Sequence, residues 1–133
     1  VNKLPLNDKP IILNHLKLSE EHYLNGKWGD SIANSRNFLE AILQEIANSI
    51  HSKKGLTTKA PDKPVLVREF LESERFIDKV EKEAIAKVYG LISNTGAHPN
   101  MAEQDEARLM RHLALTFSQY SLLNYESFVK NNP

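Results

Sequence analysis

Cysteine is absent from the 133-residue chain. This absence excludes disulfide-stapled scaffolds, thiol catalysis, iron–sulfur clusters and zinc sites that use cysteine. No apolar run approaches the length of a membrane span, and no signal peptide opens the sequence. We therefore expect a cytoplasmic protein with no membrane partner.

An excess of charge of either sign is also missing, because 17 lysines and arginines balance 17 acidic residues. This balance argues against a broadly polybasic nucleic-acid binder and leaves room only for a local basic patch. The 41% of hydrophobic residues is typical of a folded chain. Residues 1–133 are predicted to form one domain. Because the chain begins with Val, we expect it to be excised from a longer protein, whose other domains are candidate partners.

Glycine and proline are scarce, at five and six residues, and most of them fall at a few joints between long helical patterns. Apolar residues recur at helical spacing over 9–25, 30–50, 65–92 and 102–130, and no segment alternates as a strand does. Ser73 is a candidate cap for a new helix, so the third segment holds one helix or two. The sequence predicts an all-α protein, a single up-down bundle of four to five helices.

Apolar stripes predict which side of each helix is buried. The second segment has the clearest stripe: Ile32, Leu39, Ile42, Leu43, Ile46 and Ile50. One face of the first segment can carry Ile12, Leu16, Tyr23 and Leu24, with Leu13 beside them. The last is expected to bury Met110, Leu113, Ala114, Phe117, Tyr120 and Leu123. Acidic residues in its first turn suit the positive end of a helix dipole: Glu103, Asp105 and Glu106.

Residues 51–64 are predicted to be an internal basic linker, because this stretch contains four lysines and a single acidic residue, Asp62. These lysines can contact phosphate groups, but the same composition is typical of a solvated loop. The chain has no Walker A sequence, which excludes a P-loop.

Metal-ligand spacings are missing from the five histidines. His15 and His22 can share a helix face but have no evident third ligand. No histidine has an acidic residue three positions before it, and the helical zinc pattern HExxH is absent. We therefore expect neither a metal site nor a cofactor.

Polar residues concentrate from Ser93 to Asn100, between two apolar helices, and read Ser-Asn-Thr-Gly-Ala-His-Pro-Asn. An imidazole such as that of His98 can move a proton, which is the chemistry of a general acid or base. A well-formed helix–helix turn, with a capping Asn94 and a hydrogen-bonding His98, accounts for the same residues without catalysis.

The segment SNTGAHP (93–99), followed by DEARLMRHLAL (105–115), resembles the HEPN superfamily, closest to its abortive-infection C-terminal type. The stretch YLNGKWGDSIANSRNFLEAILQEI (23–46) is similar to the first helical pair of that family. There a helix carries an acidic residue among its apolar positions, here Glu40. The resemblance extends roughly from His15 to Phe128.

The resemblance implies a helical bundle that forms a homodimer. Active HEPN members are metal-independent endoribonucleases of defence systems. Their motif is an Arg, then a polar residue, then a His. Asn94 matches the polar residue and His98 matches the His, but Ser93 stands at the Arg position and cannot carry charge. Arg108, Arg111 and Arg36 are the candidate replacements. Loss of a donor that clamps a phosphate typically lowers the rate about 10²–10³-fold.

The resemblance therefore implies a HEPN-like module of a prokaryotic defence protein that dimerises, binds RNA, or both, without full nuclease activity. Two alternatives stay open: a metal-independent endoribonuclease that uses His98 with a non-motif arginine, and a bundle that only binds proteins. In the first two readings, His98, Asn94 and Glu40 are the candidate catalytic residues, with Glu40 orienting His98 or an arginine. The candidate RNA-binding residues are Ser93, Arg108, Arg111 and Arg36. An ion pair of Arg108 with Asp105 is the structural alternative for that arginine.

Overall fold

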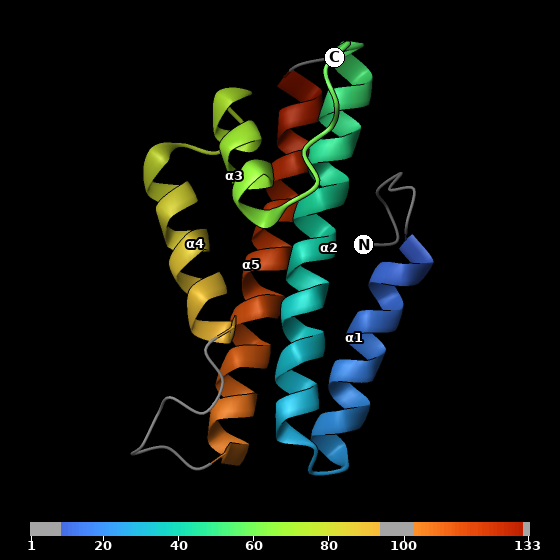
Figure 1. The fold of residues 1–133 in the computed structure, drawn as a ribbon, viewed down its shortest axis with the longest axis vertical. Coiled ribbons are helices and arrows are strands. Elements are labelled where there is room, and N and C mark those ends of the chain that lie inside the picture. Colours follow the sequence, from blue (N-terminus) through green and yellow to red (C-terminus); the bar gives the residue numbers. More distant parts are fainter. Residues whose placement is uncertain (1–8, 94–102, 132–133) are drawn as a thin grey trace.

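A computed structural model describes residues 9–93 and 103–131. These residues form five helices and no strands (Figure 1). The helices are α1 (Lys9–Leu24), α2 (Trp28–Lys54), α3 (Pro64–Ser73), α4 (Lys79–Ser93) and α5 (Glu103–Asn131). The prediction of an all-helical protein with four to five helices is confirmed for the described part of the chain.

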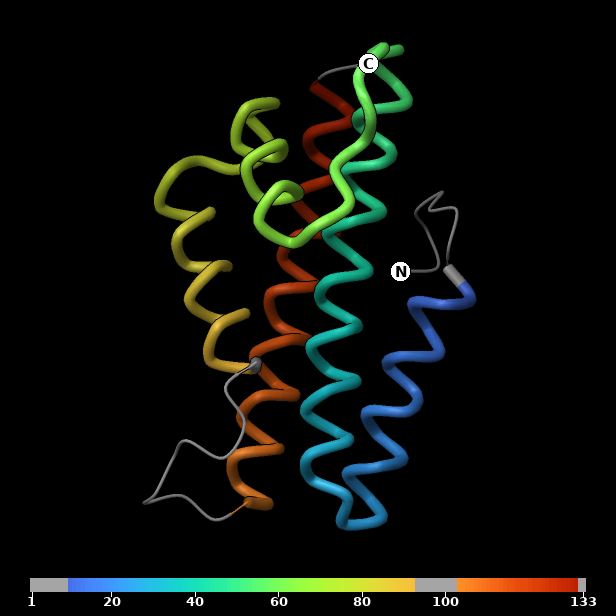
Figure 2. Tube along the Cα trace, in the orientation of Figure 1, coloured from blue at the N-terminus to red at the C-terminus, as the bar shows by residue number. Residues whose placement is uncertain are grey.

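The helix α2 is the spine of the bundle and contacts all four other helices. The longer helices α1, α2, α4 and α5 alternate in direction, and the short α3 lies beside the upper half of α2 (Figures 1 and 2). All six residues of the predicted α2 stripe are buried, and Leu39, Ile42 and Ile46 have no exposed surface. The core therefore forms around α2, as its 3.6-residue periodicity predicted.

The helix α2 is longer than its apolar stripe, since it begins at Trp28 and continues to Lys54. Gly55 ends it in the left-handed conformation, at φ 63°. The segment between α2 and α3 is therefore 55–63, shorter than the predicted linker over 51–64. Two contacts hold it against α2, because Gln44 donates to the carbonyl of Pro61 at 2.6 Å and His51 to that of Thr58 at 2.6 Å.

The third apolar segment contains two helices, separated by a turn over 74–78. The amide of Phe76 donates to the carbonyl of Leu71 and that of Arg75 to the carbonyl of Glu72, which is the Schellman pattern. Arg75 takes the left-handed position, at φ 61°, where glycine is usual. Phe76 and Leu71 are both buried, so the turn is fastened to the core on its inner side.

Asp78, rather than Ser73, caps the start of α4. The Asp78 carboxylate accepts from the amide of Glu81 at 2.7 Å, and the Glu81 carboxylate accepts from the amide of Asp78 at 3.0 Å. This reciprocal capping box satisfies two amides that a helix start leaves without partners. The second oxygen of Glu81 accepts from the hydroxyl of Tyr120, so the cap also joins α4 to α5.

Three buried serines join α1 to α2. The hydroxyls of Ser19 and Ser35 are hydrogen-bonded to each other at 2.7 Å, and Ser31 donates to the carbonyl of Ser19 at 2.8 Å. All three are at most 3% exposed. Because each hydroxyl has a partner, burying them does not carry the cost of an unsatisfied polar group.

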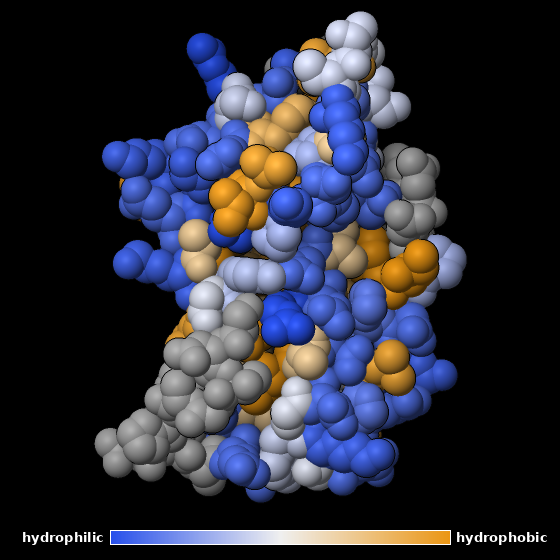
Figure 3. Space-filling model, viewed as in Figure 1, coloured by the Kyte–Doolittle hydropathy of each residue, from blue (hydrophilic) through white to orange (hydrophobic). Residues whose placement is uncertain are grey.

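The predicted buried faces of α1 and α5 were partly wrong. Tyr120 and Leu123 are 48% and 66% exposed, and serines 118 and 121 occupy the buried side of α5 instead. On α1, Ile12 is fully buried but Leu13 and Leu24 are exposed. On the face of the molecule in Figure 3, apolar side chains form separate small patches within a polar surface. No helix in the described ranges has the length and apolarity needed to span a membrane.

Candidate functional site

The centre of the predicted site, His98 with Asn94, lies outside the described residues. Ser93 is the last described residue of α4, and α5 begins at Glu103. Of the predicted site residues, the structure therefore describes Ser93, Glu40 and the three arginines.

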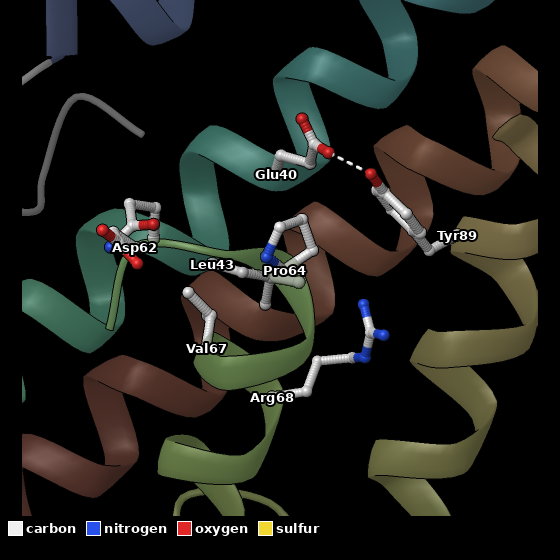
Figure 4. Close-up of a pocket in the computed structure, with 8 residues that line it drawn as sticks. Glu40, Leu43, Asp62, Pro64, Val67, Arg68 and Tyr89 are labelled. Carbon is white, nitrogen blue, oxygen red and sulfur yellow. Dashed lines mark hydrogen bonds between the residues drawn. The ribbon is translucent and has the colours of Figure 1, made fainter.

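Glu40 is the predicted site residue that contacts α4. The Tyr89 hydroxyl, one helical turn before Ser93, donates a hydrogen bond to Oε1 of Glu40 (Figure 4). Both side chains are half-buried. The Tyr89 hydroxyl therefore fixes the Glu40 carboxylate through Oε1. The other oxygen, Oε2, accepts no hydrogen bond from a described residue.

The hydrogen bond between Glu40 and Tyr89 also fixes the register of two antiparallel helices. Since α2 and α4 run in opposite directions (Figure 2), a step of four residues back along α2 matches a step of four residues forward along α4. These steps lead to Arg36 and Ser93, which therefore stand at the same level of the bundle. Arg36 is half-buried and forms no ion pair with a described residue. We call the surface made by Arg36, Glu40 and Tyr89 the α2–α4 face.

A cavity of about 140 Å³ adjoins this face between α2, α3 and α4. Glu40, Tyr89 and Arg68 line it, together with the apolar side chains of Leu43 and Val67 (Figure 4). The guanidinium of Arg68 lies over the ring of Tyr89, 5.4 Å from its centroid. Tyr89 thus contacts a carboxylate through its hydroxyl and a guanidinium through its ring. Such stacking is favourable because the face of an aromatic ring is negative.

Asp62 lies at the solvent side of the cavity. The Lys59 ammonium, 3.1 Å from the Asp62 carboxylate, forms a hydrogen bond and an ion pair with it. This contact lowers the pKa of Asp62 below its ordinary value. The two charges are opposite, so the pair is neutral overall. Because both groups are exposed, they remain hydrated.

The other two predicted arginines lie on α5. Arg111, whose side chain is 19% exposed, is held between α5 and α1, where it stacks on Tyr23 at 5.8 Å from the ring centroid. Its guanidinium is 3.8 Å from the Glu20 carboxylate. Arg108 is exposed and pairs with Asp105 at 3.3 Å, the local ion pair expected from their spacing. Of the three candidate replacements for the motif arginine, Arg36 is the one that forms no ion pair with a described residue.

Sequence reasoning missed Tyr89 and Arg68. Tyr89 lies among the apolar residues of its helix, where nothing in the sequence marks it as a site residue, and Arg68 belongs to no motif. One signal was available for Tyr89, since it stands four residues before Ser93 and therefore on the same side of α4.

Among residues 9–93 and 103–131, no group of three His, Cys, Asp or Glu side chains is arranged to hold a metal ion. The acidic residues near the site are instead engaged by Tyr89 and Lys59. Comparison with known proteins gives no relative: neither a protein-family model, a curated protein nor a solved structure matches the chain.

Proposed function

We propose that this chain is a cytoplasmic, HEPN-like module of a prokaryotic defence protein, and that it binds RNA at the α2–α4 face. The observation that carries the proposal is the register of α2 against α4. Residue Arg36 of α2 is level with Ser93 of α4, and in the resemblance Ser93 stands where the HEPN motif has its arginine. A half-buried guanidinium without an ion pair in the described structure is suited to a phosphate, which it can bind through two parallel hydrogen bonds.

Glu40 and Tyr89 have a positioning role in this proposal. Their hydrogen bond joins α2 to the last two turns of α4 and keeps the two helices in register. Because the guanidinium of Arg36 is only one helical turn from Glu40, the same bond fixes the level at which the cation meets RNA. The homodimer expected of this family belongs to the same proposal.

Salt-dependent RNA binding tests the proposal. Fluorescence anisotropy with a labelled single-stranded RNA should give an affinity that falls log-linearly with salt concentration. Arg36→Gln should reduce the slope by about 0.7, the contribution of one phosphate contact on a single strand. Arg75→Gln is the matched control, because it removes the same charge from an exposed side chain on the turn before α4, and it should leave the slope unchanged.

Two outcomes would refute the proposal. If no RNA binds at 50 mM salt, the chain acts as a protein-interaction bundle. If both arginine variants change the slope equally, binding reflects overall charge rather than this face.

The register of Arg36 against Ser93 also favours a second candidate function, metal-independent RNA cleavage. RNA supplies its own 2′-hydroxyl as nucleophile, so cleavage needs a group that moves protons and a cation that stabilises the phosphate. In this proposal, His98 fills the first role and Arg36 the second. Cleavage in EDTA that is lost in both His98→Ala and Arg36→Gln, but not in Arg75→Gln, would establish it. An intact RNA that stays bound would instead favour the non-catalytic module.

A further inference from the structure

Glu40 and Arg68 present opposite charges to the same cavity without neutralising each other. They form no ion pair, and Tyr89 stands between them, with its hydroxyl on one and its ring against the other. Oε2 of Glu40 accepts no hydrogen bond from a described residue, and Arg68 forms no ion pair with one. The cavity therefore has a hydrogen-bond acceptor on one side and a guanidinium donor on the other.

Its charge and volume define the ligand. The opposite charges of Glu40 and Arg68 sum to zero although the two groups form no ion pair, and the exposed Asp62 is paired with Lys59, so a neutral polar ligand is favoured over an ion. The volume of about 140 Å³ is just below the 150 Å³ at which a protein cavity holds a single benzene ring, so the cavity can enclose the six-membered ring of a base while a fused second ring extends out of it. The apolar side chains of Leu43 and Val67 complete a wall against which a flat ring can pack.

We infer that this cavity binds a guanine base. Guanine carries two adjacent donors, N1–H and the exocyclic N2 amine, which match a carboxylate, and two adjacent acceptors, O6 and N7, which match a guanidinium. Adenine lacks the paired donors, and uracil has a single one. The inference deepens the proposed RNA binding and rests on it: Arg36 contacts a phosphate, and the cavity beside it selects the base.

The base-binding step can be tested with mononucleotides, which separate it from binding of the RNA chain. Chemical-shift titration with 5′-GMP, 5′-IMP and 5′-AMP compares three ligands that share one phosphate, so differences report the base alone. GMP should bind about tenfold more tightly than IMP, which lacks only the N2 amine. The shifted amides should cluster around Glu40, Arg68 and Tyr89.

Two substitutions assign the contacts. Glu40→Gln keeps an oxygen that can accept from Tyr89 but removes the carboxylate, so it should abolish the preference for GMP over IMP. Arg68→Lys keeps the charge and removes the planar fork, and should weaken GMP binding about tenfold. Glu83→Gln, an exposed position on α4, is the matched control and should bind as the unmodified chain does. If Glu40→Gln does not fold, Arg68→Lys still tests the cavity.

Equal affinities for the three nucleotides, shifted amides elsewhere, or a preference that survives Glu40→Gln would overturn the inference. The anisotropy experiment with RNA separates its failure from that of the proposed function. RNA that binds without preferring a guanine-containing sequence retains the proposed function and refutes the guanine site. Selective GMP binding without any RNA binding would retain the site and refute the RNA-binding function.

Discussion

Replacing Arg75 with glycine should stabilise the protein. Arg75 is the only non-glycine residue with positive φ in the described part of the chain, and it occupies the position of a Schellman turn that glycine usually fills. A left-handed conformation costs an L-residue about 1–2 kcal/mol, because its Cβ approaches the following carbonyl oxygen. Glycine removes that strain but adds freedom to the unfolded chain, which costs about 0.4–1 kcal/mol.

The difference between these terms predicts a net gain of about 0.5–1 kcal/mol in the free energy of unfolding for Arg75→Gly. For a chain of this length, the gain corresponds to a rise of about 2–4 °C in Tm. Urea denaturation followed by circular dichroism measures the free energy, and a thermal scan measures Tm.

Gly55 provides the opposite experiment, because it ends α2 at nearly the same φ. A Cβ built on Gly55 meets no atom within 4 Å, so Gly55→Ala tests the backbone conformation alone. It should destabilise the protein by about 1 kcal/mol. If Arg75→Gly leaves stability unchanged or lowers it while Gly55→Ala behaves as expected, the Arg75 side chain makes a stabilising interaction and the reasoning from strain is wrong.

Three further predictions concern the core and the start of α4. Leu39→Ala, at a position of α2 with no exposed surface, should lower the free energy of unfolding in urea by about 2–5 kcal/mol. Asp78→Ala should remove half of the capping box and cost about 1 kcal/mol in the same measurement, and no loss would mean that the cap is not needed. The hydrogen bond to Glu81, together with partial burial and the negative charge of Glu81, raises the pKa of Tyr120 above its ordinary value of 10.0. Since the folded pKa is the higher one, this stabilisation is complete below pH 10 and is lost as the pH rises through the folded pKa. Unfolding in urea from pH 8 to 11.5 should therefore show a smaller fall in stability for Tyr120→Phe than for the unmodified chain, and equal falls would contradict the assignment.

The fold was predictable where the periodicity of apolar residues alone decided which side of a helix is buried. The stripe of α2 lies in a long helix that packs against neighbours on several sides, so every apolar position on it became buried. On α5, hydrophobicity alone chose Tyr120 over Ser121, but the structure buries the serine. Ser121 can be buried at little cost because its hydroxyl donates to the carbonyl of Phe117 in its own helix, at 2.7 Å. A pattern of apolar residues contains no information about that local hydrogen bond.

The candidate site was predictable only in part, for a similar reason. Glu40 was named as a site residue through a resemblance along the sequence, and in the structure it accepts a hydrogen bond from Tyr89 of α4. Tyr89 and Arg68 come from two other helices and are 21 positions apart, so no local pattern connects them. Their relation appears only when α3 and α4 both pack on α2, which places the guanidinium over the ring.

The central position of α2 has a consequence for how the molecule opens. Every other helix packs on α2, whereas α1 and α4 have no direct contact among the described residues. Either outer helix can therefore detach while the pair α2 and α5 stays closed. Amide hydrogens of α2 should be exposed only when the whole chain unfolds, and they should exchange with solvent last. Those of α4 and α1 should exchange earlier and independently of each other, so the two flanks of the bundle form separate cooperative units around one common support.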